Sequence, residues 1–146
     1  MTKLVRSKFP FGLLAIVAVC SPACAQVVMS YDAPAAEFTN DVTVSCKSIA
    51  FAMTSDATGQ TVVRLNGSVL SGADAQIVRE FVSEQAASVR SSFRCHRDEF
   101  IIASLTRASS DGQGKISYDK ITFKVSQSNL EVIEQIEVTA EDFFYR

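Results

Sequence analysis

The chain has 146 residues and a formal net charge of −2, and 47% of its residues are hydrophobic. A chain of this length is expected to form one domain with a sizeable core, and its many valine, isoleucine and phenylalanine residues favour strands. The slight excess of acidic side chains argues against a nucleic-acid partner, because nucleic-acid binders present a basic face.

The N-terminal segment, residues 1–25, has the three-part pattern of a secretory signal peptide. A leader with three basic residues precedes a short apolar run from Phe11 to Val19. The triplet Ala-Cys-Ala at residues 23–25 fits the pattern of a signal-peptidase site, which predicts cleavage before Gln26. A membrane anchor is the weaker alternative, since a spanning helix needs roughly 20 apolar residues and this run is about half as long.

Cleavage changes both the charge and the cysteine count. It removes three of the fourteen basic residues and none of the sixteen acidic ones, which leaves a net charge of −5. It also removes Cys20 and Cys24, at which lipidation is the lesser alternative. The mature chain is therefore predicted to be periplasmic or extracellular, in a bacterium, with no stable membrane span after cleavage.

Two cysteines, Cys46 and Cys95, remain after cleavage. An even count in an oxidising compartment predicts a disulfide between them, with free or intermolecular thiols as the alternative. Closing a loop of this length is worth on the order of 4 kcal/mol in the chain-entropy account.

His96, the chain's one histidine, follows Cys95 directly and raises the question of a catalytic or metal site. Neighbouring residues on a strand point to opposite faces, which is a poor geometry for proton transfer from the thiol. One histidine and two cysteines without CxxC or HxxxH spacing leave a tetrahedral metal site incomplete. We therefore predict no catalytic residue, no metal, no cofactor and no enzymatic activity.

The first part of the mature chain, residues 26–40, has no sustained periodicity and is predicted to be a flexible N-terminal arm. Residues 41–146 are predicted to form a single disulfide-stapled domain. Apolar residues alternate through 41–53 but change phase after Cys46, which indicates a bulge or two short strands. Residues 61–70 predict another strand, interrupted by Asn66-Gly67 at a bulge, a brief return strand or a full hairpin.

A helix is predicted over residues 71–92, where apolar side chains recur at helical spacing. Ser71 is expected to cap its N-terminus together with Asp74, and Arg90 falls in its last turn. We expect its apolar face to cover the protein's own sheet, and a partner-binding face is the alternative.

Three further strands are predicted over residues 99–108, 115–126 and 130–138, the last two forming a hairpin. Lysines on one hairpin strand and glutamates on the other predict cross-strand pairs. The resulting order is strand, strand, helix and three strands. We therefore predict an α+β fold: a mainly antiparallel sheet of about five strands, covered by one amphipathic helix.

Two groups of side chains are candidates for partner contact. The C-terminal aromatic residues are predicted either to complete the core or to anchor another protein. Arg90, Arg94 and Arg97 are predicted either to form a solvated network with nearby acids or to bind an anion. The candidate contact residues are Phe143, Phe144, Tyr145, Arg94 and Arg97.

Two function classes follow from these observations. The first is an exported, small, non-catalytic interaction domain whose partner is another envelope or secreted protein. The alternative is a small-molecule binding module with an apolar pocket between helix and sheet, lined by Phe81, Phe100 and Phe123.

Overall fold

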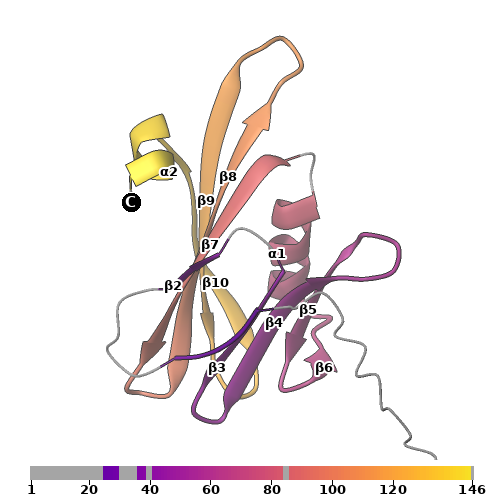
Figure 1. Cartoon of the computed structure of the whole chain (residues 1–146), viewed down its shortest axis with the longest axis vertical. Coiled ribbons are helices and arrows are strands. Elements are labelled where there is room, and N and C mark those ends of the chain that lie inside the picture. Colours follow the sequence, from indigo (N-terminus) through magenta and orange to yellow (C-terminus); the bar gives the residue numbers. More distant parts are fainter. Residues whose placement is uncertain (1–24, 30–35, 39–40, 84–85, 146) are drawn as a thin grey trace, which may run out of the picture.

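The protein consists mainly of β-strands that form two sheets (Figure 1). The computed structural model describes residues 25–29, 36–38, 41–83 and 86–145. Of the predicted signal peptide, residues 1–25, all but Ala25 lie outside the described residues.

The first sheet, sheet A, has five strands in the order β1-β3-β4-β5-β6. Strand β1 pairs with β3 in parallel, and the other neighbours are antiparallel. Its strands are β1 (Ala25–Val28), β3 (Val42–Cys46), β4 (Ile49–Ser55), β5 (Thr61–Leu65) and β6 (Ser68–Val69).

The second sheet, sheet B, also has five strands, in the order β10-β9-β8-β7-β2, and is antiparallel throughout. Its central strands are about twice as long as those of sheet A. Its strands are β2 (Ala36–Phe38), β7 (Ala86–His96), β8 (Phe100–Ser110), β9 (Ile116–Val125) and β10 (Leu130–Val138).

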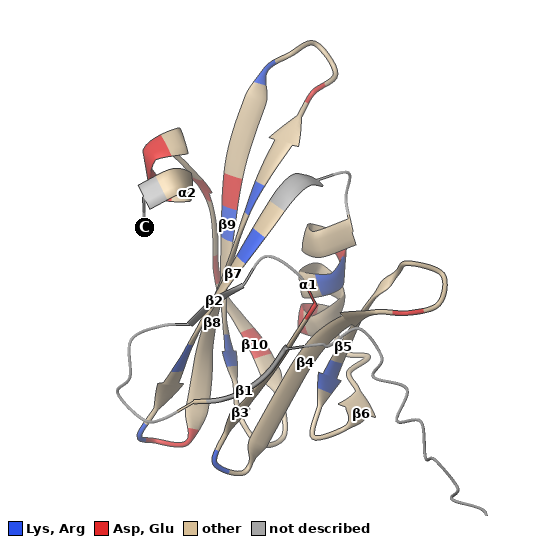
Figure 2. Cartoon of the chain, in the orientation of Figure 1, with Lys and Arg blue, Asp and Glu red and all other residues tan. Residues whose placement is uncertain are grey.

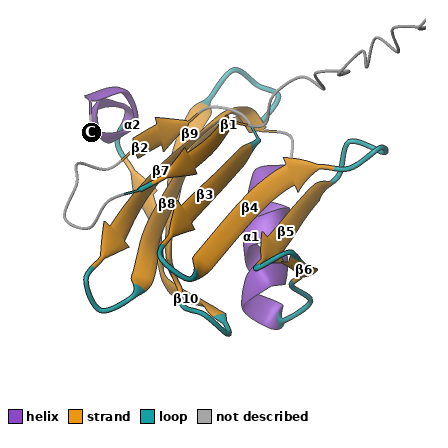
Figure 3. Cartoon of the chain, turned by 60° about the horizontal axis from the view of Figure 1, so that its bottom comes forward, coloured by secondary structure: helices purple, strands orange, loops and turns teal. Residues whose placement is uncertain are grey.

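Two short helices complete the described structure. Helix α1 (Ala73–Ser83) follows β6 and packs against β5 and β10, so that it closes one side of the space between the sheets (Figure 3). Helix α2 (Ala140–Tyr145) follows β10 and contacts β8 on the face of sheet B that points away from sheet A (Figure 1).

The predicted fold class is wrong, because the strands form two sheets and not one sheet covered by one amphipathic helix. Each sheet has an apolar face, and the two faces bury each other. The ring of Phe51 in sheet A lies 5.9 Å from that of Phe93 and 5.7 Å from that of Phe123 in sheet B. We call this buried side of each sheet its inner face and the opposite side its outer face.

The predicted helix over residues 71–92 is also wrong in its extent. Helix α1 ends at Ser83, and the residues from Ala86 onward belong to strand β7. Strand β7 pairs with β8 along nearly its whole length, and Phe93 is fully buried on its inner face. This non-local pairing and burial outweigh the local helical spacing.

The predicted cap of this helix is wrong as well. Helix α1 begins at Ala73, and the amide of Gln76 donates a hydrogen bond to the carbonyl of Gly72. The Asp74 carboxylate does not reach back to Ser71; it accepts a hydrogen bond from the amide of Val132 in β10, at 3.1 Å.

Several local predictions are confirmed. The change of phase after Cys46 is a turn between two short strands, β3 and β4. Asn66 and Gly67 both have positive φ, as the tight turn of a hairpin requires, and the return strand β6 is brief. Strands β9 and β10 form the predicted hairpin, in which Lys124 lies opposite Glu131.

The residues predicted to form an N-terminal arm contribute to both sheets. Strand β1 begins at Ala25 and lies at one edge of sheet A. Strand β2 pairs with β7 at one edge of sheet B. The stretch predicted to be an arm therefore includes an edge strand of each sheet.

Candidate interaction surface

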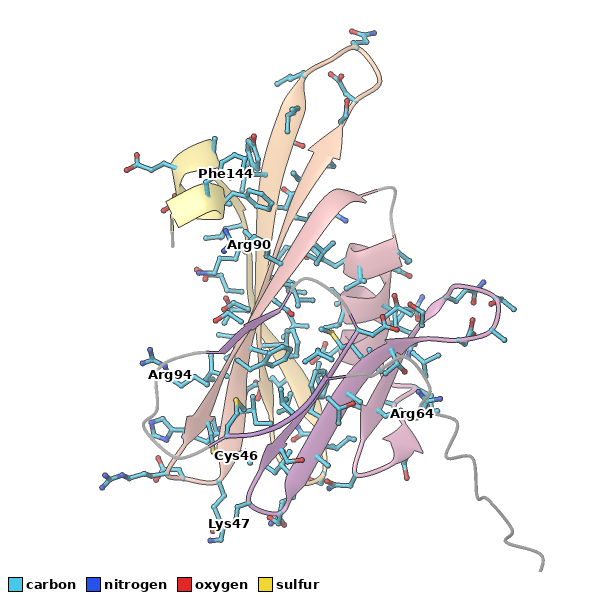
Figure 4. All side chains as sticks on the ribbon, in the orientation of Figure 1. Cys46, Lys47, Arg64, Arg90, Arg94 and Phe144 are labelled. Carbon is cyan, nitrogen blue, oxygen red and sulfur yellow. A yellow bond between two sulfur atoms is a disulfide. The ribbon has the colours of Figure 1, made fainter. Side chains whose placement is uncertain are left out.

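The predicted disulfide is present and joins the two sheets. Cys46 ends β3 and Cys95 lies near the end of β7, with their Cα atoms 5.7 Å apart. Both cysteines are buried, and Figure 4 shows Cys46 at the end of sheet A that meets β7. The ion pair between Lys47 and Glu99 lies in the turns next to the disulfide.

His96 points away from the disulfide, as adjacent strand positions require. Its ring stacks on Phe100 with 4.4 Å between ring centroids, and its Nδ1 atom lies 3.3 Å from a carboxylate oxygen of Asp98. The ammonium of Lys124 lies 4.4 Å from the centre of the Phe100 ring. This cluster is therefore an exposed stacked arrangement, and the neighbouring sulfur of Cys95 is already bonded.

The structure separates the three arginines of the predicted cluster. Arg90 donates a hydrogen bond to the carbonyl of Phe143 at 2.7 Å, so it holds helix α2 on the outer face of sheet B. Arg94 is exposed on the same face, roughly 13 Å further along the strand at 3.3 Å per residue. Arg97 is exposed in the turn after β7. Figure 4 shows Arg90 beside α2 and Arg94 toward the other end of β7.

Thr139 caps the N-terminus of helix α2, a feature that sequence analysis missed. The amide of Asp142 donates to the hydroxyl of Thr139 at 3.2 Å, and that hydroxyl donates to the Asp142 carboxylate at 2.9 Å. The spacing of a threonine and an acid three residues later is the signal that would have predicted a helix start here.

The two C-terminal phenylalanines lie in different environments. Phe143 is 4% exposed and packs on Tyr118 of β9, with 5.2 Å between ring centroids. Phe144 is 58% exposed, although its ring lies 5.1 Å from that of Phe143 and 6.2 Å from that of Tyr118. Phe143 thus attaches the helix to the sheet, and Phe144 presents an aromatic ring to solvent. The side chain of Tyr145 lies outside the described residues.

Two exposed isoleucines extend the apolar surface around Tyr118. Ile116 precedes Tyr118 by two residues on β9, so both side chains point to the outer face. Ile136 of β10 lies opposite Lys120 and is therefore a diagonal neighbour of Tyr118. We call the group formed by Ile116, Tyr118, Ile136 and Phe144 the outer patch.

Charged residues lie around the outer patch (Figure 2). Lys120 and Arg90 are on the outer face of sheet B, and Glu134 of β10 lies opposite Thr122. Glu141 is exposed on α2. An apolar centre with a polar, charged rim is the usual arrangement of a protein-binding surface.

The three aromatic residues predicted to line a ligand pocket are not brought together. Phe81 of α1 and Phe123 of β9 are both buried in the core between the sheets. Phe100 lies on the outer face of sheet B, against His96 and Lys124. A surface hollow of about 780 Å³ beside α1 is lined by polar residues such as Gln60 and Arg79 and includes none of the three.

The described residues contain neither a helix that could span a membrane nor a cluster of metal-binding side chains. Neither described helix has the length and apolar character needed to cross a membrane. In the same part of the chain, no three histidine, cysteine or acidic side chains gather in a way that would hold a metal ion.

Comparison with known proteins does not place the chain in a family. Protein-family models, curated proteins and solved structures were compared with it, and none matches.

Proposed function

We propose that the protein is an exported, non-catalytic interaction domain that binds another envelope or secreted protein through the outer patch. The observation that carries this proposal is the exposure of Phe144 on a helix whose neighbouring Phe143 and Arg90 contacts hold it in place. An aromatic ring held rigidly at the surface loses little conformational freedom on binding, which is why such rings dominate binding energies.

The proposed footprint extends beyond the aromatic ring. A typical interface covers roughly 800 Å² on each partner. A partner seated on Phe144 and Ile136 would extend along the outer face of sheet B toward Arg94, which is exposed there. Arg97, in the turn at the end of β7, marks the limit of this footprint.

Export is supported by two independent features of the chain. The leader and the Ala-Cys-Ala triplet at residues 23–25 have the pattern of a cleaved signal peptide. The disulfide between Cys46 and Cys95 is consistent with an oxidising compartment. Expression in a bacterium, followed by fractionation and intact mass measurement, is expected to find a chain that begins at Gln26 outside the cytosol. A full-length cytosolic chain would contradict export.

The proposed interaction can be tested with two matched variants. Phe144→Ser removes the exposed ring of the outer patch, and Val69→Ser removes a side chain that is 57% exposed on sheet A. For both variants the free energy of unfolding is expected to lie within about 0.5 kcal/mol of the wild-type value, since each changes an exposed side chain.

The readout is quantitative capture of envelope proteins by an N-terminally tagged mature chain. Phe144→Ser is expected to capture at least about tenfold less of the main partner protein than the wild type does, which corresponds to about 1.4 kcal/mol of binding energy. Val69→Ser is expected to capture as much of that protein as the wild type. If both variants capture the same proteins in the same amounts as the wild type, the outer patch is not the binding surface.

A further inference from the structure

Strand β10 is the edge strand of sheet B next to the outer patch. It has nine residues, and β9 is its one strand neighbour in the described part of the chain. An edge strand presents unpaired backbone N–H and C=O groups that can accept a strand from another chain. Whether β10 is available for such pairing depends on what covers its free side.

The first half of β10 is covered by helix α1. The Asp74 carboxylate accepts the hydrogen bond of the Val132 amide, and Leu130 and Val132 pack against the core. A β-bulge follows between Val132 and Glu134. This half therefore has no free edge at which another strand could pair.

The second half, from Glu134 to Val138, is regularly paired with β9 on one side. Because the Val132 amide points away from β9, the alternation of the ladder directs the backbone groups of Gln135 and Glu137 to the free side as well. Helix α2 packs on the outer face over Tyr118 and so does not lie along this edge. This stretch of five residues has a regular register and is long enough to pair with an added strand.

This half of β10 lacks two of the residue types that protect edge strands. Proline and lysine on an edge strand hinder its pairing with another chain, and the sequence from Glu134 to Val138 contains neither. Its exposed residues are instead three carboxamide or carboxylate side chains and Ile136. Ile136 belongs to the outer patch, so the open edge and the patch form one continuous surface.

The charge of β10 selects the kind of strand that can pair with it. Glu131, Glu134 and Glu137 are all exposed along the strand. A second copy of this chain, paired antiparallel about Ile136, would place each Glu137 opposite Gln135 of the other copy and so make the two Glu137 side chains diagonal neighbours on one face, which is disfavoured by like-charge repulsion. A strand with lysine or arginine would instead place opposite charges across the new ladder.

We infer that the open half of β10, Glu134–Val138, accepts an extended segment of the partner protein as an added strand, in which basic residues three positions apart lie opposite Glu134 and Glu137 and a β-branched apolar residue lies opposite Ile136. This inference rests on the proposed function, because Ile136 of the outer patch flanks the added strand. Backbone hydrogen bonds supply affinity in this mode of recognition, and the side chains on either face supply specificity.

The test uses a random dodecapeptide library displayed on phage and selected against the mature, disulfide-bonded protein. Gln135→Pro removes an outward backbone N–H without breaking the ladder to β9, since proline is tolerated at such edge positions. Gln135→Ala is the matched control. Replacing Glu134 and Glu137 together by lysine reverses the charge without any change of backbone.

Wild type and Gln135→Ala are expected to enrich peptides with two basic residues three positions apart and a β-branched residue between them. Gln135→Pro and the lysine double variant are each expected to bind these peptides at least about tenfold more weakly, because a backbone donor or the charge attraction is lost. Bound peptide is also expected to slow amide hydrogen exchange at Gln135 and Glu137 by about tenfold or more.

Two outcomes would overturn the inference: no enrichment of such peptides, or equal binding by Gln135→Pro. Phe144→Ser separates this failure from that of the proposed function. If Phe144→Ser loses its envelope partners while Gln135→Pro captures them fully, the outer patch is the binding surface and strand addition is rejected. If Gln135→Pro weakens peptide binding while Phe144→Ser captures envelope proteins as the wild type does, strand addition is kept and the outer patch is rejected as the binding surface.

Discussion

Adjacent side chains in this protein point to different faces of the element that carries them. Adjacent residues of a helix diverge by about 100°, so Phe143 packs on the sheet while Phe144 faces solvent. Adjacent residues of a strand point to opposite faces, so Cys95 enters the core while His96 stays exposed. Backbone periodicity thus explains why the Cys95 sulfur and the His96 imidazole lie on opposite faces of strand β7.

The Asp56 carboxylate provides a pH prediction at this scale. It accepts hydrogen bonds from the Thr58 hydroxyl at 2.6 Å, the Gln60 amide at 3.0 Å and the Thr58 amide at 2.8 Å. These bonds, the one from the Thr58 hydroxyl first, lower the pKa of Asp56 below its usual 3.8. Because the pKa is lower in the folded state, the stabilisation is present above about pH 4 and is lost as the pH falls through the folded pKa.

The measurement is an NMR titration of the Asp56 carboxyl carbon. The wild type is expected to titrate below 3.8, and Thr58→Val is expected to bring the pKa back toward this value because the hydroxyl donor is gone. An unchanged titration in Thr58→Val would contradict the role of the hydroxyl.

At the scale of elements, the end of helix α1 is fixed by a residue of β8. The Arg107 guanidinium donates to the Phe81 carbonyl at 3.2 Å, lies 4.4 Å from the centre of the Phe81 ring and pairs with Asp119 of β9 at 3.2 Å. Its side chain is mostly buried. A cation at the C-terminal end of a helix satisfies a free carbonyl and complements the helix dipole. This contact stabilises the C-terminal end of helix α1.

Arg107→Ala is therefore expected to lower the free energy of unfolding by about 2 kcal/mol, since it leaves a carbonyl and a carboxylate without their charged donor. Arg94→Ala, on the exposed part of β7, is expected to change it by less than about 0.5 kcal/mol. Urea denaturation of both variants checks the difference. Equal stability of the two variants would show that Arg107 does not hold the helix end.

At the scale of the whole molecule, the disulfide joins two sheets that have no continuous hydrogen bonding with each other. Sheet B extends beyond sheet A, and α1 covers its inner face while α2 lies on its outer face (Figures 1 and 3). The aromatic contacts of Phe51 with Phe93 and Phe123 hold the sheets together through burial. The disulfide contributes mainly by restricting the unfolded chain.

Replacing Cys46 and Cys95 together by alanine is expected to lower the free energy of unfolding by about 4 kcal/mol, the entropy of closing a loop between residues 49 positions apart. The dependence of this free energy on urea is expected to steepen, because the unlinked unfolded chain exposes more surface. Urea denaturation of the double variant and of the reduced wild type is expected to agree. A loss below about 1 kcal/mol in both would contradict the proposed contribution of the bond.

The candidate surface shows how far local sequence signals extend. The aromatic tail stood out in the sequence, but its division into buried Phe143 and exposed Phe144 required the position of Tyr118, more than twenty residues earlier. Thr139 and Asp142, three residues apart, were present in the sequence and could have predicted the start of helix α2. The open edge of β10 could not be predicted, since its availability depends on where α1 and α2 pack.

The sequence by itself determined the features that depend on neighbouring residues: the strands with alternating burial, the Asn66-Gly67 turn and the β9–β10 hairpin. It also determined the disulfide, because two cysteines remain once the predicted leader is excluded. Only the tertiary structure decided that β7 is a strand and not a continuation of the helix, and that the strands divide between two sheets. The physical reason is that sheet membership is set by hydrogen bonds and burial between residues distant in the sequence, which no local periodicity encodes.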